Sequence, residues 1–354
     1  MMKRSRLLHL AGSLAGIALL HPVTAFAADE KKESDKDPGE VNLYTHRHYE
    51  SDEVIFSRFT EETGIKINVV KAGADELIER LKSEGSASPA DLLITADAGR
   101  LVRAKDAKLL QPISSEGLEA NVPENLRDPE GYWFALTRRA RILAYAKDRI
   151  DPSELSTYEA LADPIWRGRL LARSSSNIYN QSLLASIIAN VGEEKATEWA
   201  TAVRKNMARP PQGSDRDQMR AVAAGLADVA IVNTYYLGLL INSTEKADQK
   251  VGQDIGVFFP NQEGRGAHIN ISGAGVTKSS KNKENAIRLL EYLVDEKQQA
   301  SFASANHEYP VNPNAEWSPL LTSWGAVKAD ELNLSELGKQ NAAAVQAFDK
   351  AGWE

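Results

Sequence analysis

Short apolar runs and helix-period stretches alternate from the start of the folded part of the chain. Residues 41–44, 65–70 and 90–95 are short runs rich in apolar residues, typical of buried strands. Between them, residues 54–63 and 75–82 place apolar side chains three and four positions apart, which predicts helices. Strands that alternate with helices at this spacing indicate an α/β fold, with a parallel sheet covered by helices on its faces.

The same reading continues to the end of the chain. We predict further strands at 132–136, 141–145, 166–172, 228–232, 255–259 and 268–272, and further helices at 181–190, 193–205, 216–225, 283–303 and 335–353. A chain of 354 residues is too long for one ordinary core, so we expect two lobes. Residues 41–137 with 265–310 form the first predicted lobe, and residues 138–264 with 311–354 form the second.

A pair of tyrosines follows one of these strands. The β-branched run 228–232 stops at Asn233 and Thr234, residue types that cap helix N-termini with a side-chain oxygen. Tyr235 and Tyr236 come next. On a strand these neighbours would point to opposite faces, whereas at a helix start both lean toward one crevice. The carboxyl ends of strands are also where open α/β sheets bind ligands.

The first 27 residues have the pattern of a secretory signal peptide. Three basic residues precede an apolar run at 7–20, and Ala25-Phe26-Ala27 has the small-x-small form of a cleavage site. We therefore expect export to the periplasm, with cleavage after Ala27. Residues 28–40 are mostly charged and predict a disordered leader.

Charge and cysteine content restrict the partners. The formal net charge goes from −7 to −10 when the signal peptide is removed, because that segment carries three basic residues and no acidic ones. Such a balance argues against nucleic acid as a partner. The chain has no cysteine, which excludes thiolate ligands and a lipid anchor on cysteine. We expect a monomer without a direct membrane anchor.

Two further tyrosines occupy equivalent places. Tyr49 follows the strand at 41–44, and Tyr179 follows the strand predicted at 166–172. One tyrosine alone most often packs, since a phenol with a pKa near 10 is neutral at pH 7. Four converging phenols would be hard, anionic ligands whose deprotonation needs a highly charged cation, which points to a trivalent ion such as Fe(III). His48 is positioned to add a nitrogen.

Other polar segments leave alternatives open. The turn Ser174-Ser175-Ser176-Asn177 is either an anion-binding turn, through residues such as Ser175 and Asn177, or an ordinary helix cap. Arg138, Arg139 and Arg141 either face a cleft or lie on a solvated edge. His46-x-His48 resembles half of a zinc site, without the further ligands of a metal-dependent hydrolase.

Three motifs together resemble a known family. Arg47-His48-Tyr49, the run 175–180 and Asn233-Thr234-Tyr235-Tyr236 are similar to the periplasmic ferric-iron-binding proteins of ABC transporters, in particular the tyrosine-rich branch of cyanobacteria. The resemblance covers about residues 41–353. It implies a two-lobed periplasmic binding protein (type II), with parallel-sheet lobes joined by crossing strands and the metal in the cleft between them.

The resemblance also implies roles for particular residues. Tyr49, Tyr179, Tyr235 and Tyr236 would be phenolate ligands, with His48 as a fifth, while Arg47 and Arg141 would balance the phenolate charge. Where another branch carries a glutamate ligand, this chain has Ala96.

The implied function is a carrier. The protein would bind Fe(III), as an ion or a chelate, and deliver it to an inner-membrane ABC permease without enzymatic chemistry. The alternatives from the residues alone are an anion-binding protein of the same fold and, on His46-x-His48 only, a hydrolase.

Overall fold

The computed structural model describes residues 38–47 and 49–354, which form one compact unit. The predicted signal peptide, most of the predicted leader and His48 lie outside these residues. Within the described part, no helix combines the length and the apolar character needed to cross a bilayer.

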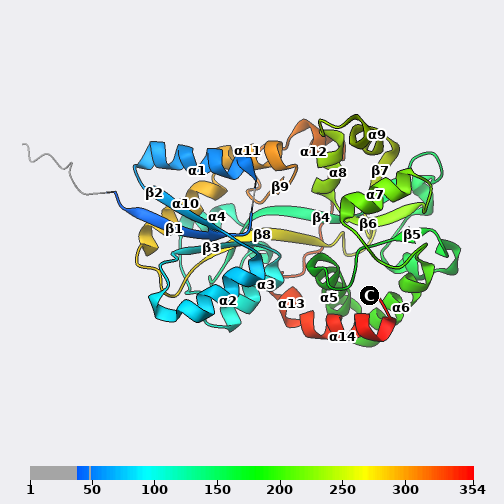
Figure 1. Cartoon of the computed structure of the whole chain (residues 1–354), viewed down its shortest axis with the longest axis horizontal. Coiled ribbons are helices and arrows are strands. Elements are labelled where there is room, and N and C mark those ends of the chain that lie inside the picture. Colours follow the sequence, from blue (N-terminus) through cyan, green and yellow to red (C-terminus); the bar gives the residue numbers. More distant parts are fainter. Residues whose placement is uncertain (1–37, 48) are drawn as a thin grey trace, which may run out of the picture. The chain divides into compact units, whose positions relative to one another are not determined.

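One half of the sheet is built from the first three strands. These are β1 (Glu40–Thr45), β2 (Lys66–Lys71) and β3 (Leu92–Ala96). β1 lies between the other two and pairs in parallel with both, as the alternation of strands and helices predicts. Helices α1 (Glu50–Thr63), α10 (Lys283–Val294) and α11 (Glu296–Asn306) lie on one side of this half, and α2 (Ala74–Glu84) and α3 (Ala98–Asp106) on the other (Figure 1).

Two long strands connect this half of the sheet to the other. β8 (Ile269–Val276) and β4 (Phe134–Ala146) run antiparallel to their neighbours, so the whole sheet is mixed although its predicted parallel pairs are present. β4 merges the two separate strands predicted at 132–136 and 141–145. Its register shifts between Ala135 and Thr137, where the Leu136 carbonyl accepts a 2.7 Å hydrogen bond from Gln299.

The second half of the sheet forms around the C-terminal part of β4. Among the described residues the sheet has nine strands in the order β2-β1-β3-β8-β4-β6-β5, with β7 and β9 also paired to β4. The remaining strands are β5 (Leu170–Leu171), β6 (Val229–Asn233), β7 (Ile255–Phe258) and β9 (Tyr309–Pro310). β5 is shorter than the predicted strand 166–172, because a 3-10 turn ends at Trp166 and Gly168 has a φ of +75°.

Helices cover both halves of the sheet (Figure 1). They are α1 (Glu50–Thr63), α2 (Ala74–Glu84), α3 (Ala98–Asp106), α4 (Glu116–Asn121), α5 (Ile178–Val191), α6 (Glu193–Asn206), α7 (Asp215–Ala223), α8 (Thr234–Ile241), α9 (Lys246–Asp254), α10 (Lys283–Val294), α11 (Glu296–Asn306), α12 (Pro319–Ser323), α13 (Ser335–Lys339) and α14 (Asn341–Ala351). Short 3-10 helices span Gly85–Ala87, Glu124–Leu126, Pro152–Glu154, Glu159–Ala162 and Pro164–Trp166.

Two predicted long helices are each divided. The helix predicted at 283–303 is α10 followed by α11, because Asp295 ends the first and its carboxylate accepts a 3.0 Å hydrogen bond from the backbone N–H of Lys297 in the second. The helix predicted at 335–353 is α13 followed by α14. Helices α3, α4, α9 and α12 and the short strand β9 were not predicted.

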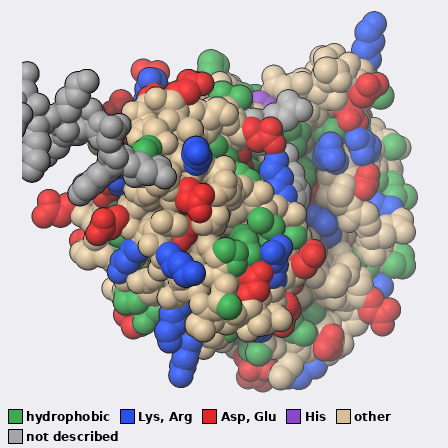
Figure 2. Space-filling view, turned by 60° about the vertical axis from the view of Figure 1, so that its left-hand side comes forward, with side chains coloured by type: hydrophobic (Ala, Val, Ile, Leu, Met, Phe, Trp, Pro, Cys, Tyr) green, Lys and Arg blue, Asp and Glu red, His purple; other side chains and the backbone are tan. Residues whose placement is uncertain are grey.

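In this topology the predicted tyrosines follow the carboxyl ends of three strands. The chain leaves β1 toward Tyr49, β5 toward α5, and β6 directly into α8, so each predicted tyrosine follows the carboxyl end of a strand. Figure 2 shows Lys and Arg side chains in the hollow at the centre of one face, with both signs of charge around it. The lobe boundaries at residues 137–138, 264–265 and 310–311 stay a prediction.

Candidate metal centre

The tyrosine pair begins a helix, as the sequence predicts. α8 starts at Thr234, and the rings of Tyr235 and Tyr236 stack with their centroids 4.1 Å apart and their planes tilted by 33°. Both side chains therefore leave the helix start on the same side.

The predicted capping role of Asn233 is wrong. No side chain caps α8. The amide oxygen of Asn233 instead accepts a 3.1 Å hydrogen bond from Arg141, and its backbone N–H donates to Asp215 at 2.8 Å. Because Arg141 is buried and charged, it is a stronger partner for this oxygen than a backbone N–H.

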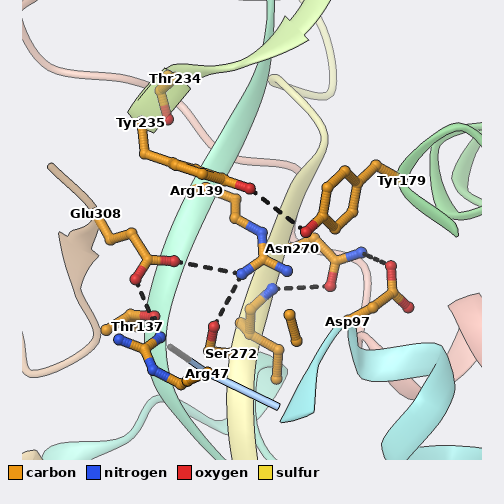
Figure 3. Close-up of polar contacts among 12 residues, drawn as sticks. Arg47, Asp97, Thr137, Arg139, Tyr179, Thr234, Tyr235, Asn270, Ser272 and Glu308 are labelled. Carbon is orange, nitrogen blue, oxygen red and sulfur yellow. Dashed lines mark hydrogen bonds and ion pairs between the residues drawn. The ribbon is translucent and has the colours of Figure 1, made fainter. Parts of the chain in front are cut away.

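Tyr179 meets the pair from α5. Asn177 caps this helix, and its side-chain oxygen accepts a 3.1 Å hydrogen bond from the backbone N–H of Tyr179. The hydroxyl of Tyr235 donates to the hydroxyl of Tyr179 at 3.4 Å, and the two rings approach from different helices (Figure 3). The side chains of α5 and α8 thus converge at their oxygen atoms, where a metal ion would bind.

Tyr49 completes the group from the N-terminal end of α1. Burial raises its pKa, and the negative charges of Glu308 and Tyr179 raise it further, while Arg47 lowers it. The guanidinium carbon of Arg47 lies 4.8 Å from the centroid of the Tyr49 ring. Tyr49 is therefore held beside Arg47 at the start of α1.

The paired tyrosines have strongly perturbed acidities. Burial raises the pKa of Tyr235 well above the ordinary phenol value, and the charges of Tyr179, Tyr49 and Tyr236 raise it further. The pKa of Tyr236 is also raised, first by burial and then by Tyr179. Without a bound cation these phenols stay neutral, because each phenolate would be buried next to another.

Two arginines face the phenols. The guanidinium carbons of Arg139 and Arg173 lie 5.3 and 6.0 Å from the centroid of the Tyr179 ring. Arg139 is 2% exposed, and its Nε and Nη2 have no hydrogen-bond partner among the described residues. Burial lowers the pKa of Arg139, but the charges of Tyr179 and Glu308 outweigh it and hold the pKa above its usual value.

Arg141 contacts residues at the starts of the two helices that carry Tyr179 and the tyrosine pair. Its guanidinium donates to Asp215 at 2.9 Å, to Asn233 at 3.1 Å and to Asn180 at 2.6 Å. Asn180 is in the first turn of α5, and Asn233 immediately precedes α8. Arg141 therefore ties together the starts of the two helices that carry Tyr179 and the tyrosine pair.

The remaining predicted residues have varied contacts. Arg47 is buried and pairs with Asp52 and Glu308. The carbonyl of Ser175 accepts a 3.0 Å hydrogen bond from Gln181. His46 accepts a 3.2 Å hydrogen bond at Nδ1 from the backbone N–H of Ala96, so this nitrogen is engaged in the fold. The predicted ligand His48 lies outside the described residues.

Carboxylate or imidazole clusters are not an alternative centre. Within residues 38–47 and 49–354, no group of three or more His, Cys, Asp or Glu side chains is arranged to hold a metal ion. A zinc site of the hydrolase type has no support in this part of the chain. The structure instead brings together the phenol oxygens of Tyr179 and Tyr235.

Sequence reasoning did not assign Arg139, Arg173 and Glu308 to the site. Arg139 had a signal, since three arginines in one strand region suggested that some face a cleft. Arg173 immediately precedes the serine turn. Glu308 follows a helix in an ordinary polar stretch, and nothing in its sequence context distinguishes it.

Comparison with known proteins identifies the family of this chain. Residues 55–329 match the sequence profile of the bacterial extracellular solute-binding proteins. The chain belongs to this family. Its architecture is that of a type II periplasmic binding protein, and solved ferric-binding proteins share it over 89% of the chain.

Individual relatives are close over nearly the full length. The chain is 50% identical over 315 residues to iron uptake protein A1 of Synechocystis, which covers 89% of this chain and 88% of that protein. A Trichodesmium protein (IdiA, FutA), solved in complex with iron and citrate ligands, superposes with a TM-score of 0.88 at 50% identity, covering 89% of this chain and all of that one. FutA2 of Synechocystis, solved without ligand, gives a TM-score of 0.85 at 47% identity, covering 89% and 99%.

Proposed function

We propose that the protein captures Fe(III) through the phenolates of Tyr49, Tyr179, Tyr235 and Tyr236 and delivers it to an ABC permease. The observation that carries this proposal is the convergence of phenol oxygens from α5 and α8, with the hydroxyls of Tyr179 and Tyr235 3.4 Å apart. Phenolates are hard oxygen ligands, which favour a hard trivalent cation. The neighbouring Arg139 and Arg173 balance the anionic charge of the ligands.

The relatives support iron as the cargo. Iron uptake proteins of Synechocystis match at 50% and 48% identity, and the Trichodesmium structure contains iron. More distant matches, at 26% identity, include the major ferric iron-binding protein of Neisseria meningitidis. We infer the same cargo here because the phenol group supplies the ligands that a ferric ion prefers.

The carrier role completes the proposal. Members of a solute-binding family hold their ligand and release it unchanged, so we propose no enzymatic activity for this chain. We further propose that it acts in the periplasm as a monomer, after removal of residues 1–27, with His48 as a fifth iron ligand. Arg47 contributes at a distance, through its place beside the Tyr49 ring.

Anion binding is the second candidate. The unpartnered Nε and Nη2 of buried Arg139 are donors that could hold an anion next to Tyr179. In that case the tyrosines would not be essential, and Tyr235→Phe with Tyr236→Phe would leave binding of the anion intact.

The test is a visible titration of the purified mature protein with ferric citrate. Phenolate-to-iron charge transfer gives a broad visible band, which we expect to saturate at one equivalent. The double variant Tyr235→Phe, Tyr236→Phe should lose the band, because two ligands are removed. The matched control is Tyr132→Phe with Tyr145→Phe, two tyrosines on or beside β4, of which Tyr132 lies beside the ammonium of Lys105 and Tyr145 packs against Gly256. Absence of a band in the unmodified protein would refute iron binding by phenolates.

A further inference from the structure

A single buried carboxylate lies between two of the arginines at the site. Glu308 is 1% exposed, and its Oε2 accepts a 3.1 Å hydrogen bond from Nη1 of Arg47. Its Oε1 accepts a 3.4 Å hydrogen bond from Nη1 of Arg139 (Figure 3). The two arginines come from different elements, one from the loop after β1 and the other from strand β4.

The backbone fixes where this carboxylate lies. Immediately after Glu308, β9 pairs with β4, with Tyr309 opposite Arg138 and Pro310 opposite Thr137. Immediately before it, His307 ends α11 in the left-handed conformation, with a φ of +56°. Glu308 is therefore held against the strand that carries Arg139, and its side chain has little freedom to move away.

The two arginines depend on Glu308 to different degrees. Arg47 also pairs with both carboxylate oxygens of Asp52, at 2.8 and 3.0 Å. Arg139 has one ion pair among the described residues, with Glu308, and its other partner is the neutral hydroxyl of Ser272 at 3.0 Å. Both bonds use Nη1, which leaves Nε and Nη2 unpartnered on the buried guanidinium beside the Tyr179 ring.

We propose that Glu308 is a positioning residue of the iron site, which holds the Arg139 guanidinium against Tyr179 so that its free N–H groups stabilise the bound phenolates. This inference rests on the proposed iron-binding function and adds a carboxylate whose described contacts are with the two arginines. Partners outside the ligand shell commonly change metal affinity by about 10- to 100-fold when they are removed. We expect Glu308→Ala to weaken iron binding by about that factor.

The charge-transfer band reports the effect directly. A cation near a phenolate oxygen lowers the energy of its donor electrons, so the band lies at shorter wavelength than it would without the cation. In Glu308→Ala the guanidinium of Arg139 loses the ion pair that holds it beside Tyr179, and the band should move to longer wavelength. We expect this effect to exceed the opposite one, which comes from removing the negative charge of Glu308 near Tyr49. Glu308→Gln, which keeps an acceptor oxygen, should show a smaller shift.

A double-variant cycle tests whether Glu308 acts through Arg139. Arg139→Met should produce a shift of its own, and adding Glu308→Ala to it should produce little more, because residues that share one contact are not additive. The control is Glu159→Gln, which neutralises the carboxylate that pairs with another arginine, Arg265, and that has no described contact with the four tyrosines of the site. Band positions in Glu308→Ala equal to those of the unmodified protein, or shifts that simply add in the double variant, would overturn the proposal.

A measurement without iron separates this inference from the function itself. Nitrogen NMR of arginine side chains detects slow rotation of a held guanidinium. We expect a slow Arg139 signal in the iron-free protein and in Glu159→Gln, and fast rotation in Glu308→Ala. If the unmodified protein has no visible band with iron, the proposed function fails. An Arg139 signal that is insensitive to Glu308→Ala shows instead that the carboxylate does not hold the arginine.

Discussion

Iron binding should release several protons, and their number can be worked out from the site. Burial and neighbouring charges raise the pKa values of Tyr49, Tyr235 and Tyr236, so these three phenols are protonated in the iron-free protein at neutral pH. Each must lose its proton to bind as a phenolate, and a fourth phenolate ligand would bring the release to four protons.

The magnitude follows from the linkage between protons and binding. In the range below the raised phenol pKa values, affinity rises with pH, because protons compete with iron for the same oxygens. One proton corresponds to about 1.4 kcal/mol per pH unit, so three to four protons change the dissociation constant by about 10³ to 10⁴ per unit. The affinity should be lost as the pH falls, not as it rises.

Calorimetry in buffers of different ionisation enthalpy measures the proton count at one pH. We expect three to four protons per iron after subtraction of the same titration with the chelator alone, and one fewer in Tyr235→Phe. A count of one or zero, or an affinity that is flat from pH 8 to pH 5, would refute the phenolate site.

Two further substitutions test the supports of the site. Arg141→Met should lower the free energy of unfolding in urea by about 3–5 kcal/mol, because Arg173 at 3.7 Å is then the remaining cation near buried Asp215 among the described residues. The exposed-pair control Arg220→Met should lower it by under about 1 kcal/mol, and equal losses would contradict the reasoning. Gly238→Ala should lower the free energy of unfolding by about 1–3 kcal/mol, because the new Cβ would lie 2.5 Å from the Cβ of His307. The overlap would displace α8 and its tyrosines and so weaken the charge-transfer band of bound iron. Gly117→Ala, whose Cβ has only ordinary 3.6 Å contacts, is the control, and the same loss there would remove the steric explanation.

Local sequence patterns correctly predicted several strands and the tyrosines that follow their carboxyl ends. The strands around residues 41–44, 65–70 and 90–95 were found because their apolar runs are short and separated by helix-period segments. The start of α8 was placed correctly, although for a partly wrong reason, since Asn233 bonds Arg141 instead of capping the helix. Local sequence indicates where a strand ends, but it cannot show which distant charged group will form a hydrogen bond with a given side chain.

The interactions that the sequence could not predict are long-range. Glu308 meets Arg47 across 261 positions and Arg139 across 169, and no local period relates such residues. The merging of two predicted strands into β4 has a similar origin. The register shift after Ala135 is stabilised by Gln299, which lies 163 positions from Leu136.

Neutral, buried phenols also determine the selectivity of the site among metal ions. Mg²⁺ and Ca²⁺ bind ready-made carboxylate and carbonyl oxygens, and a doubly charged ion offsets the loss of several phenol protons poorly. Within residues 38–47 and 49–354 no carboxylate or histidine cluster offers these ions a preformed set of ligands. A protein of this design would not bind the common divalent cations of its compartment. Its protonated tyrosines would bind only a metal ion that is a strong enough Lewis acid to displace their protons.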